Sequence, residues 1–288
     1  MASILTETRR LLQAHGLRPK KRLGQTFLVD RNILGKILKE GELQRSDRVL
    51  EIGAGVGTLT MALAERCRRV IAVEIDSGLF QILQGVLAGR PAVTLVHGDA
   101  LYLDFRRLLE EEGPWKVIAN LPYSVATPLL TRLLGLSHCF SLLLLMVQEE
   151  VAERLIASPG NKAYGSLTVL TQYYTDIRIV TRVSRTAFYP APQVDSALVK
   201  LQVLPVPRVR PGDPDLFFRL VRAAFAHRRK TLKNALVQSK CVPLDRQEIQ
   251  AVLERTGLSL HRRGETLSLQ EFQKLADYLL ARINGAVA

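Results

Sequence analysis

The 288 residues, 47% of them hydrophobic, are enough for a globular protein with one large domain and a smaller second one. The longest apolar run, residues 142–147 within a stretch from residue 139, is far shorter than the roughly 20 residues that span a membrane, and no secretory signal precedes it, so we expect a cytoplasmic protein without membrane association. Three widely separated cysteines and five scattered histidines predict neither disulfides nor a metal site, whereas the formal charge of +13 points to an anionic partner.

From residue 48 onward, short apolar runs alternate with segments whose apolar residues have helical spacing. Strands are predicted at residues 48–52, 70–75, 93–97, 116–119 and 140–147, with helices at 58–66, 77–87, 106–112 and 128–134. This alternation is typical of a mostly parallel, Rossmann-like α/β sheet. Two further strand-like runs, 177–183 and 197–203, have no long helix between them and predict an antiparallel pair that brings the sheet to seven strands.

Residues 204–214 contain four prolines and a glycine, which neither a strand nor a helix tolerates. We therefore predict a domain boundary here, with an α/β domain at 1–204 and a small all-helical domain at 205–288. Helical patterns follow at 215–229, 245–256 and 268–283, and the last begins with Ser268 and Glu271 spaced as a capping box.

The positive charge is confined to two segments. Residues 1–40 hold nine basic and three acidic residues, a net +6, and residues 205–240 hold nine and two, a net +7. This distribution predicts a polyanion-binding surface built from both, although a merely solvated basic surface remains the alternative. The basic residues predicted to contact this polyanion are Lys20, Lys21, Arg22, Arg222, Arg228, Arg229, Lys230 and Lys233.

A glycine loop, residues 53–57, joins the first predicted strand to a helix, and Glu74 lies at the end of the next strand. Glycines let the backbone approach a ligand closely, and a carboxylate at this position suits two ribose hydroxyls, so the pattern predicts a nucleoside cofactor. NAD remains an alternative for the loop taken alone, although Thr58 stands where dinucleotide enzymes place a third small residue.

Two polar groups follow the next strands. Asp99 and Ala100 come after the third strand, where the carboxylate either accepts from an adenine amino group or caps a helix. Asn120, Leu121, Pro122 and Tyr123 follow the fourth. If the Asn120 side-chain oxygen and the Leu121 carbonyl accept the two hydrogens of an exocyclic amine, its lone pair turns toward a methyl donor, and Tyr123 stacks on the purine.

The chain resembles the KsgA-type small-subunit ribosomal RNA adenine dimethyltransferases over residues 18–280. The resemblance is carried by residues 20–28, 51–55, 98–100, 120–123, 188–196 and 225–234, together with Glu74. It implies S-adenosylmethionine as cofactor, dimethylation at N6 of two adjacent adenosines near the 3′ end of 16S rRNA, and a role in small-subunit biogenesis. It also implies that Phe188 faces the target base opposite Tyr123, although a core phenylalanine remains the alternative.

The family's cofactor positions correspond to Gln25, Thr26, Leu28, Gly53, Gly55, Glu74, Ile75, Asp99, Ala100 and Asn120. Thr26 departs from the asparagine or histidine that is usual in the family, which puts its contact in doubt. The expected partner is small-subunit rRNA in an assembled or partly assembled subunit, and a monomer is expected. The alternatives are a large-subunit adenine methyltransferase of the macrolide-resistance type and a non-catalytic assembly or transcription factor on the same fold.

Overall fold

The computed structural model describes residues 2–109, 113–123, 125–227 and 229–285. The chain divides into two compact units, Met1–Ala152 with Asp176–Pro205 and Glu153–Thr175 with Val206–Ala288. Residues 153–175, which the boundary at residue 204 assigns to the α/β domain, belong to the second unit. The reason is apolar packing, because Val169 and Tyr173 are buried in the same cluster as Phe217.

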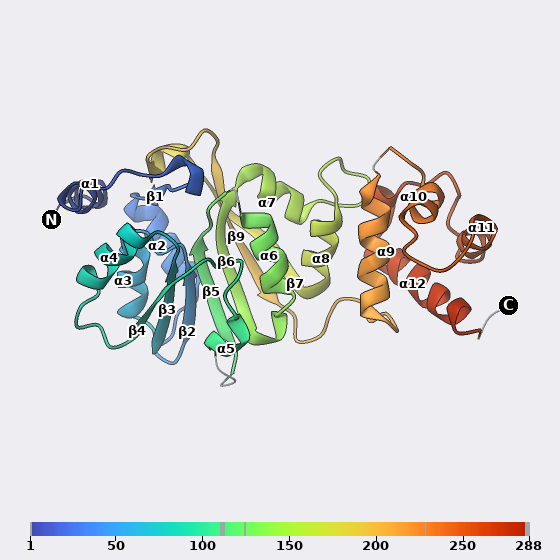
Figure 1. The fold of residues 1–288 in the computed structure, drawn as a ribbon, viewed down its shortest axis with the longest axis horizontal. Helices are drawn as coiled ribbons and strands as arrows, with labels where there is room; N and C mark the ends of the chain where they lie inside the picture. The colour runs from blue at the N-terminus through green and yellow to red at the C-terminus, as the bar shows by residue number, and fades with distance from the viewer. Residues whose placement is uncertain (1, 110–112, 124, 228, 286–288) are drawn as a thin grey trace. The chain divides into compact units, whose positions relative to one another are not determined.

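A seven-stranded sheet with the order β4-β3-β2-β5-β6-β9-β7 forms the centre of the first unit (Figure 1). The strands are β2 (Arg48–Ile52), β3 (Arg69–Glu74), β4 (Val93–His97), β5 (Trp115–Asn120), β6 (Phe140–Gln148), β7 (Thr175–Val183) and β9 (Ser196–Val203). The first five in spatial order pair in parallel, and β9 runs antiparallel to β6. The predicted mostly parallel sheet, with the last two strands adjacent at its edge, is confirmed.

Both faces of this sheet are covered. Neighbouring residues of a strand point to opposite faces, yet Val49 and Leu50 in β2 are both fully buried, as are Val70 and Ile71 in β3. The near-continuous apolar composition of these strands follows from this double burial.

The helices of the unit are α1 (Ile4–Ala14), α2 (Arg31–Glu40), α3 (Thr58–Ala64), α4 (Ser77–Val86), α5 (Phe105–Leu109), α6 (Ala126–Leu134) and the start of α7 (Glu149–Ile156). Three short 3-10 turns accompany them, η1 (Lys21–Leu23), η2 (Ser137–Cys139) and η3 (Arg185–Ala187).

A short antiparallel ladder brings the N-terminal segment back to the chain between β7 and β9. In it β1 (Phe27–Leu28) pairs with β8 (Phe188–Tyr189), and Leu28 lies opposite Phe188. Two-residue strands leave no periodic pattern, so neither was predicted. The helices α1 and α2 were also missed, and residues 110–112 of the predicted third helix lie outside the described residues.

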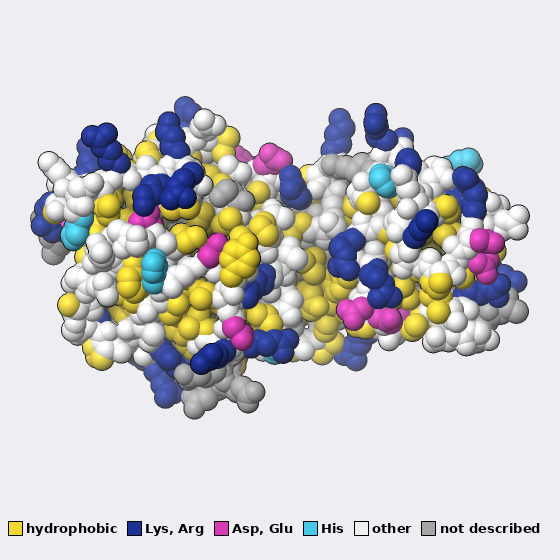
Figure 2. All heavy atoms as spheres, in the orientation of Figure 1, with side chains coloured by type: hydrophobic (Ala, Val, Ile, Leu, Met, Phe, Trp, Pro, Cys, Tyr) yellow, Lys and Arg dark blue, Asp and Glu magenta, His cyan; other side chains and the backbone are white. Residues whose placement is uncertain are grey.

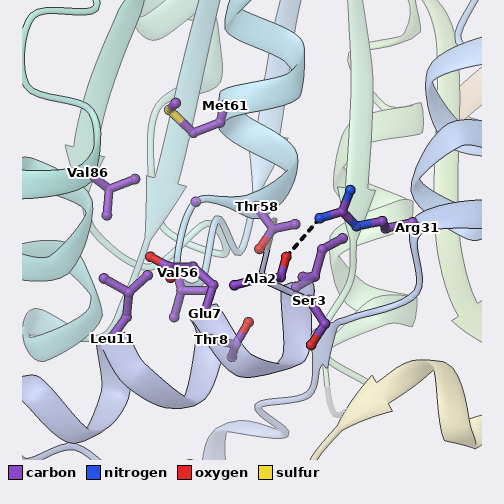
Figure 3. A pocket seen from close by; sticks show the side chains of 12 residues that line it. Ala2, Ser3, Glu7, Thr8, Leu11, Arg31, Val56, Thr58, Met61 and Val86 are labelled. Carbon is purple, nitrogen blue, oxygen red and sulfur yellow. Dashed lines mark hydrogen bonds between the residues drawn. The ribbon is translucent and has the colours of Figure 1, made fainter.

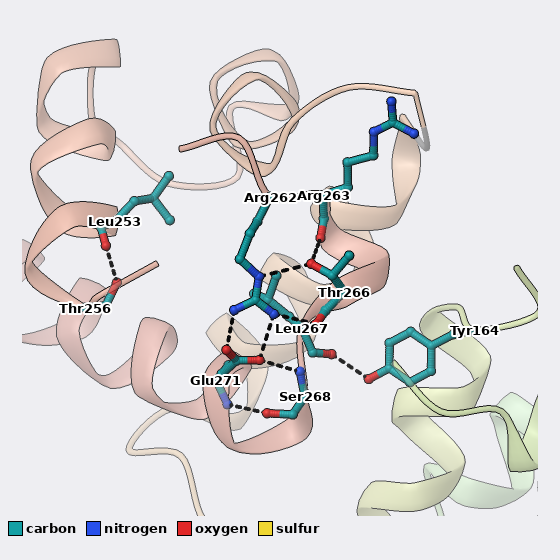
Figure 4. Close-up of polar contacts among 9 residues, drawn as sticks. All are labelled: Tyr164, Leu253, Thr256, Arg262, Arg263, Thr266, Leu267, Ser268 and Glu271. Atoms are coloured by element: carbon teal, nitrogen blue, oxygen red, sulfur yellow. Dashed lines mark hydrogen bonds and ion pairs between the residues drawn. The ribbon is translucent and has the colours of Figure 1, made fainter. Parts of the chain in front are cut away.

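The second unit is built from α8 (Ser166–Tyr174), α9 (Pro214–Ala226), α10 (Leu232–Ser239), α11 (Arg246–Arg255), the turn η4 (Gly264–Thr266) and α12 (Leu269–Ile283). No strand occurs in its described residues after 206, as the helical prediction requires, although α10 was missed. The predicted capping box of α12 is present, since Ser268 accepts from the Glu271 amide and Glu271 accepts from the Ser268 amide. Arg262 donates to the same Glu271 carboxylate and ties η4 to the start of α12 (Figure 4).

Candidate active site

Three cavities that share Gly53 lie at the carboxyl ends of β2, β3, β4 and β5, and we call them the strand-end cleft. The first, of about 60 Å³, is lined by Gln25, Thr26, Glu74 and Asn120 among others. The second, of about 160 Å³, is lined by Ile75, Asp99 and Ala100, and the third, of about 40 Å³, by Leu28 and Gly55. The cleft thus brings together all ten residues predicted to bind the cofactor, which are Gln25, Thr26, Leu28, Gly53, Gly55, Glu74, Ile75, Asp99, Ala100 and Asn120.

Glycine is required at the floor of this cleft. Gly53 has φ +77° and Gly55 has φ +62°, a region that other residues rarely adopt. A β-carbon on Gly53 would lie 3.6 Å from the Asn120 carbonyl oxygen, and one on Gly55 would lie 3.1 Å from the Phe27 ring. The missing side chains therefore leave space for a ligand against the backbone.

Glu74 is 4% exposed, and both its carboxylate oxygens accept from the backbone. Oε2 accepts from the Gly55 amide at 2.9 Å, and Oε1 from the Asp76 amide at 2.9 Å. Burial raises the pKa of Glu74, while the Asp76 and Gly55 amides oppose that shift. Each oxygen retains a second lone pair for a ribose hydroxyl, so Glu74 fixes the glycine loop and remains an acceptor.

Asp99 lines the second cavity and also caps a turn. Its Oδ1 accepts from the Leu101 amide at 2.8 Å, and its carbonyl accepts from the amides of Tyr102 and Leu103. The alternative of a helix cap is wrong, because Asp99 closes a turn and the next helix, α5, begins at Phe105 with Asp104 accepting from the Arg107 amide. One carboxylate oxygen of Asp99 holds the turn, and the second stays available as an acceptor for a ligand.

Asn120 is held in one orientation at the end of β5. Its Nδ2 donates to the Thr26 carbonyl at 2.9 Å, and its buried Oδ1 has no hydrogen-bond partner among the described residues. A buried carbonyl oxygen without a donor is costly, so this atom is an acceptor site for a ligand. Leu121 and Pro122 line the first cavity beside Asn120, as the prediction requires.

Tyr123 and Phe188 do not line the strand-end cleft. The half-buried Tyr123 donates to or accepts from Ser196 Oγ at 2.6 Å, and burial raises its pKa against the opposing effect of that contact. Phe188 is 4% exposed and packs in a core cluster with Leu28 and Ala187. The structure therefore places Phe188 as the core residue that the sequence left as the alternative, and a role against the base stays a prediction.

Glu51 was not singled out, although it lines the third cavity together with Asn120. It is 2% exposed, and its Oε2 has no hydrogen-bond partner among the described residues. Burial raises the pKa of Glu51 to about 8, with the Thr60 hydroxyl opposing the shift and the Glu74 carboxylate adding to it. Its position as the last but one residue of a buried strand, two residues before the glycine loop, was the signal available in the sequence.

Glu51→Gln is expected to abolish a pH dependence of stability in the ligand-free protein. Between the ordinary pKa of 4.5 and the folded pKa of about 8, Glu51 holds a proton in the folded state alone. The free energy of unfolding of the wild-type protein therefore falls as pH rises through this window. The free energy of unfolding of Glu51→Gln, relative to that of wild type, should rise by about 2 kcal/mol from about pH 5 to about pH 7. Urea unfolding followed by the fluorescence of the single tryptophan, Trp115, measures this in the first unit.

The exposed Glu65, which directly follows the C-terminal end of α3, supplies the control. Glu65→Gln should leave the difference from wild type constant across the same pH range. If the free energy of unfolding depends on pH in the same way in wild type and in Glu51→Gln, Glu51 does not hold its proton in the folded state.

The predicted RNA-binding residues fall in both units. Lys21 and Arg22 are exposed, and Arg22 also lines the second cavity, whereas Lys20 Nζ lies 2.7 Å from Asp76 Oδ2. In the second unit, Arg222 in α9 is exposed, as are Arg229 and Lys230 after it, Lys233 in α10 is half-buried, and Arg228 lies outside the described residues. Figure 2 shows Lys and Arg side chains gathered over the N-terminal segments of the first unit and over the helices of the second.

A larger cavity, of about 320 Å³, lies between α1 and the start of α3 (Figure 3), and it shares Val56 and Thr58 with the third cavity of the strand-end cleft. It is lined by apolar side chains with Glu7, Thr8, Arg31 and Thr58 among them, and Arg31 donates to the Ala2 carbonyl. It contains none of the residues predicted for chemistry. Among the described residues, no group of three or more His, Cys, Asp or Glu side chains is arranged to hold a metal, and no helix is long and apolar enough to cross a membrane.

A mostly parallel seven-stranded sheet with one antiparallel strand inserted beside β6, and an acidic cleft at its carboxyl edge, define the Rossmann-like methyltransferase fold. The family described as ribosomal RNA adenine dimethylase matches residues 16–279. This chain belongs to that family.

Individual relatives agree. Ribosomal RNA small subunit methyltransferase A of Pelotomaculum thermopropionicum is 48% identical over 281 residues, covering 94% of this chain and 95% of the relative. Its counterpart in Geobacter sulfurreducens is 48% identical, and the match covers 94% of this chain and 98% of the relative. Among solved structures, a dimethyladenosine transferase from Plasmodium falciparum has a TM-score of 0.73 at 28% identity, and the match covers 90% of this chain and 98% of that protein. The 23S rRNA methyltransferase ErmE has a TM-score of 0.66 at 25% identity, and the match covers 88% of this chain and 99% of that protein.

Proposed function

We propose that this protein dimethylates N6 of two adjacent adenosines near the 3′ end of small-subunit (16S) rRNA, with S-adenosylmethionine as methyl donor. The observation that carries the proposal is the buried Asn120 Oδ1, which shares the strand-end cleft with Glu74 and finds no hydrogen-bond partner in the portion of the chain that the structure describes. The family membership and the 48% identity to small-subunit methyltransferases support it over the large-subunit alternative, since the similarity to ErmE is 25%. A purely non-catalytic factor would have no need for these side chains.

The residues of the cleft fit this cofactor. Glu74 offers carboxylate oxygens to a ribose, Asp99 offers an acceptor to an adenine amino group, and the glycines leave the backbone open. Glu74 and Asp99 place two carboxyl groups in the cleft of a chain whose formal charge is +13, and such a cleft suits a cationic sulfonium compound better than the polyanionic RNA. When bound, S-adenosylmethionine supplies an electrophilic methyl group on a good leaving group.

The chain's own residues prepare the acceptor nitrogen. The lone pair of an adenine amine is delocalised into the ring, and it becomes available when acceptors draw the two N–H bonds out of the ring plane. Asn120 Oδ1 is one such acceptor, oriented by the Thr26 carbonyl, and the Leu121 carbonyl is the proposed second. The Leu121 amide donates to Met146 in the neighbouring strand, which holds the peptide carrying these groups at the strand end. After transfer, the cationic nitrogen loses a proton to water without a strong base.

Binding of the target requires the adenosine to leave its stacked position in the RNA. The Tyr123 ring, anchored by its hydroxyl to Ser196, supplies a fixed face on which a purine stacks. The proposed partner is an assembled or partly assembled small subunit in the cytoplasm, approached by a monomer. The basic residues of both units supply phosphate contacts, and a contribution to subunit biogenesis accompanies the modification.

The proposal is tested by transfer of tritiated methyl groups from S-adenosylmethionine to purified ribosomal particles that lack the modification. Small-subunit particles are expected to accept up to two methyl groups on each of two adenosines, and large-subunit particles none. Digestion to nucleosides identifies the product as N6,N6-dimethyladenosine. Labelling of large-subunit particles alone would establish the other substrate, and labelling of neither would refute the proposed activity.

The basic residues of the second unit predict a salt dependence. Arg222→Gln, Arg229→Gln and Lys230→Gln together should make the plot of log affinity against log salt concentration shallower by about two to three units, because each phosphate contact releases counterions. Particle binding is measured between about 50 and 200 mM salt. Arg255→Gln with Lys274→Gln, which removes exposed charges from the neutral segment after residue 241, serves as control. If the plot of log affinity against log salt concentration has the same slope in the triple variant and in the control variant, the residues Arg222, Arg229 and Lys230 do not contact RNA phosphates.

A further inference from the structure

Residues 20–25 form a closed turn that builds one wall of the strand-end cleft. The Leu23 amide donates to the Lys20 carbonyl at 3.1 Å, and the Gly24 amide donates to the Lys21 carbonyl at 3.0 Å. The Lys20 amide donates to Gln25 Oε1 at 2.8 Å, which closes the turn. Leu23, Gly24 and Gln25 then line the first cavity. The position of this turn therefore sets the width of the cleft next to Glu74.

Two side chains of the turn bind the same buried carboxylate, Asp76. Its Oδ2 accepts from Lys20 Nζ at 2.7 Å and from Gln25 Nε2 at 3.1 Å. Its Oδ1 accepts from the amides of Gly78 and Leu79 and so caps α4. The backbone amide of Asp76 donates to Glu74 Oε1 at 2.9 Å. The attachment point and the proposed ribose-binding carboxylate are thus joined by one hydrogen bond.

We propose that Lys20 is a positioning residue for the cofactor, whose ion pair with Asp76 holds the 20–25 turn against the strand-end cleft, and not a phosphate contact as its place in a basic segment predicts. This inference rests on the proposed function in taking the methyl-donor cofactor as the ligand of the cleft. The turn's two other basic residues, Lys21 and Arg22, are exposed and keep the predicted role toward RNA.

The environment of the pair supports a structural role. The Asp76 side chain is 2% exposed, whereas the Lys20 side chain is 40% exposed, so the lysine covers the carboxylate from the solvent side. Burial raises the pKa of Asp76, but Lys20, the Leu79 amide, Gln25 and the Gly78 amide together bring that pKa below its ordinary value. Removing Lys20 leaves a buried carboxylate with fewer donors and the turn with one fewer attachment, because Gln25 alone then links it to Asp76.

The first measurement is cofactor affinity by calorimetry without RNA, using S-adenosylmethionine as the probe. Lys20→Met should raise the dissociation constant about tenfold, since one hydrogen-bonded ion pair that orders the cavity wall is lost. Lys20→Arg should restore affinity to within about threefold, because a guanidinium also reaches the carboxylate. Lys21→Met, the matched control one residue away, should leave affinity unchanged. In an Asp76→Asn background, which keeps a helix-capping side chain, Lys20→Met should add little.

The second measurement uses the ligand-free protein and is independent of the cofactor. Hydrogen exchange of the amides of residues 20–25 should accelerate about tenfold in Lys20→Met and remain unchanged in Lys21→Met, with the β-strands of both variants as protected as in wild type. If hydrogen exchange in the turn is unchanged in Lys20→Met, and Lys20→Met and Lys21→Met raise the KM for RNA equally, Lys20 contacts phosphate and does not position the turn. Failure of the wild-type protein to bind S-adenosylmethionine would refute the proposed function instead, while the exchange experiment would still decide whether Lys20 holds the turn.

Discussion

Replacing Asn120 with alanine is expected to lower kcat by at least about a hundredfold at saturating cofactor and RNA, the scale typical of removing one positioned polar group from a transition state. The Asn120 side-chain oxygen is buried and has no hydrogen-bond partner in the described part of the chain, so we expect it to accept from the amine when the target enters. Radioactive methyl transfer under single-turnover conditions isolates this step from product release.

Two controls separate the chemical effect from binding. Because Asn120 also donates to Thr26 and lines the first cavity, calorimetry is expected to show a modest loss of cofactor affinity. A gel shift with small-subunit particles should show almost unchanged RNA affinity. If Asn120→Ala retains the wild-type kcat, Asn120 does not stabilise the transition state. If the variant loses RNA affinity in proportion to its loss of activity, Asn120 acts in substrate recognition instead.

The enzyme is expected to act on small-subunit particles with a kcat/KM about a hundred to a thousand times that on a short hairpin carrying the same two adenosines. The net charges of +6 in residues 1–40 and +7 in residues 205–240 lie in segments that belong to different units. A short hairpin offers too few phosphates to occupy both. Each lost contact weakens binding, and the everted base alone does not compensate.

This comparison is made at matched ionic strength, with the exposed-charge variant of Arg222, Arg229 and Lys230 included. If both basic segments bind RNA at once, that variant should lose most of its advantage on particles and little activity on the hairpin. Equal efficiency of the wild-type protein on both substrates would mean that recognition is confined to the loop, and the inference from the charge distribution would have to be abandoned.

The strand pattern alone predicted the sheet and the strand-end residues Gly53, Glu74, Asp99 and Asn120 of the cleft. Gln25, Thr26 and Leu28 were expected only from the family resemblance, and Glu51 was missed. Long buried strands have a strong apolar signal, and parallel strands end at the same edge of a sheet. Gly53, Glu74, Asp99 and Asn120 each lie at the end of such a strand or one or two residues after it, so their convergence was predictable without knowing any side-chain orientation. The capping box of α12 was likewise predictable, because it is a local pattern of Ser268 and Glu271.

Tertiary structure decided the features that depend on distant partners. The carboxyl group of Glu51 becomes a site of raised pKa only through its burial and the nearby Glu74. Lys20 belongs by sequence to a basic segment, yet its ammonium group pairs with Asp76, 56 positions later in the chain. Phe188 is buried because its two-residue strand pairs with Leu28, and residues 153–175 join the helical unit because their apolar side chains pack there. Local patterns determine elements and strand ends, whereas charge pairing and burial depend on which distant residues the fold brings together.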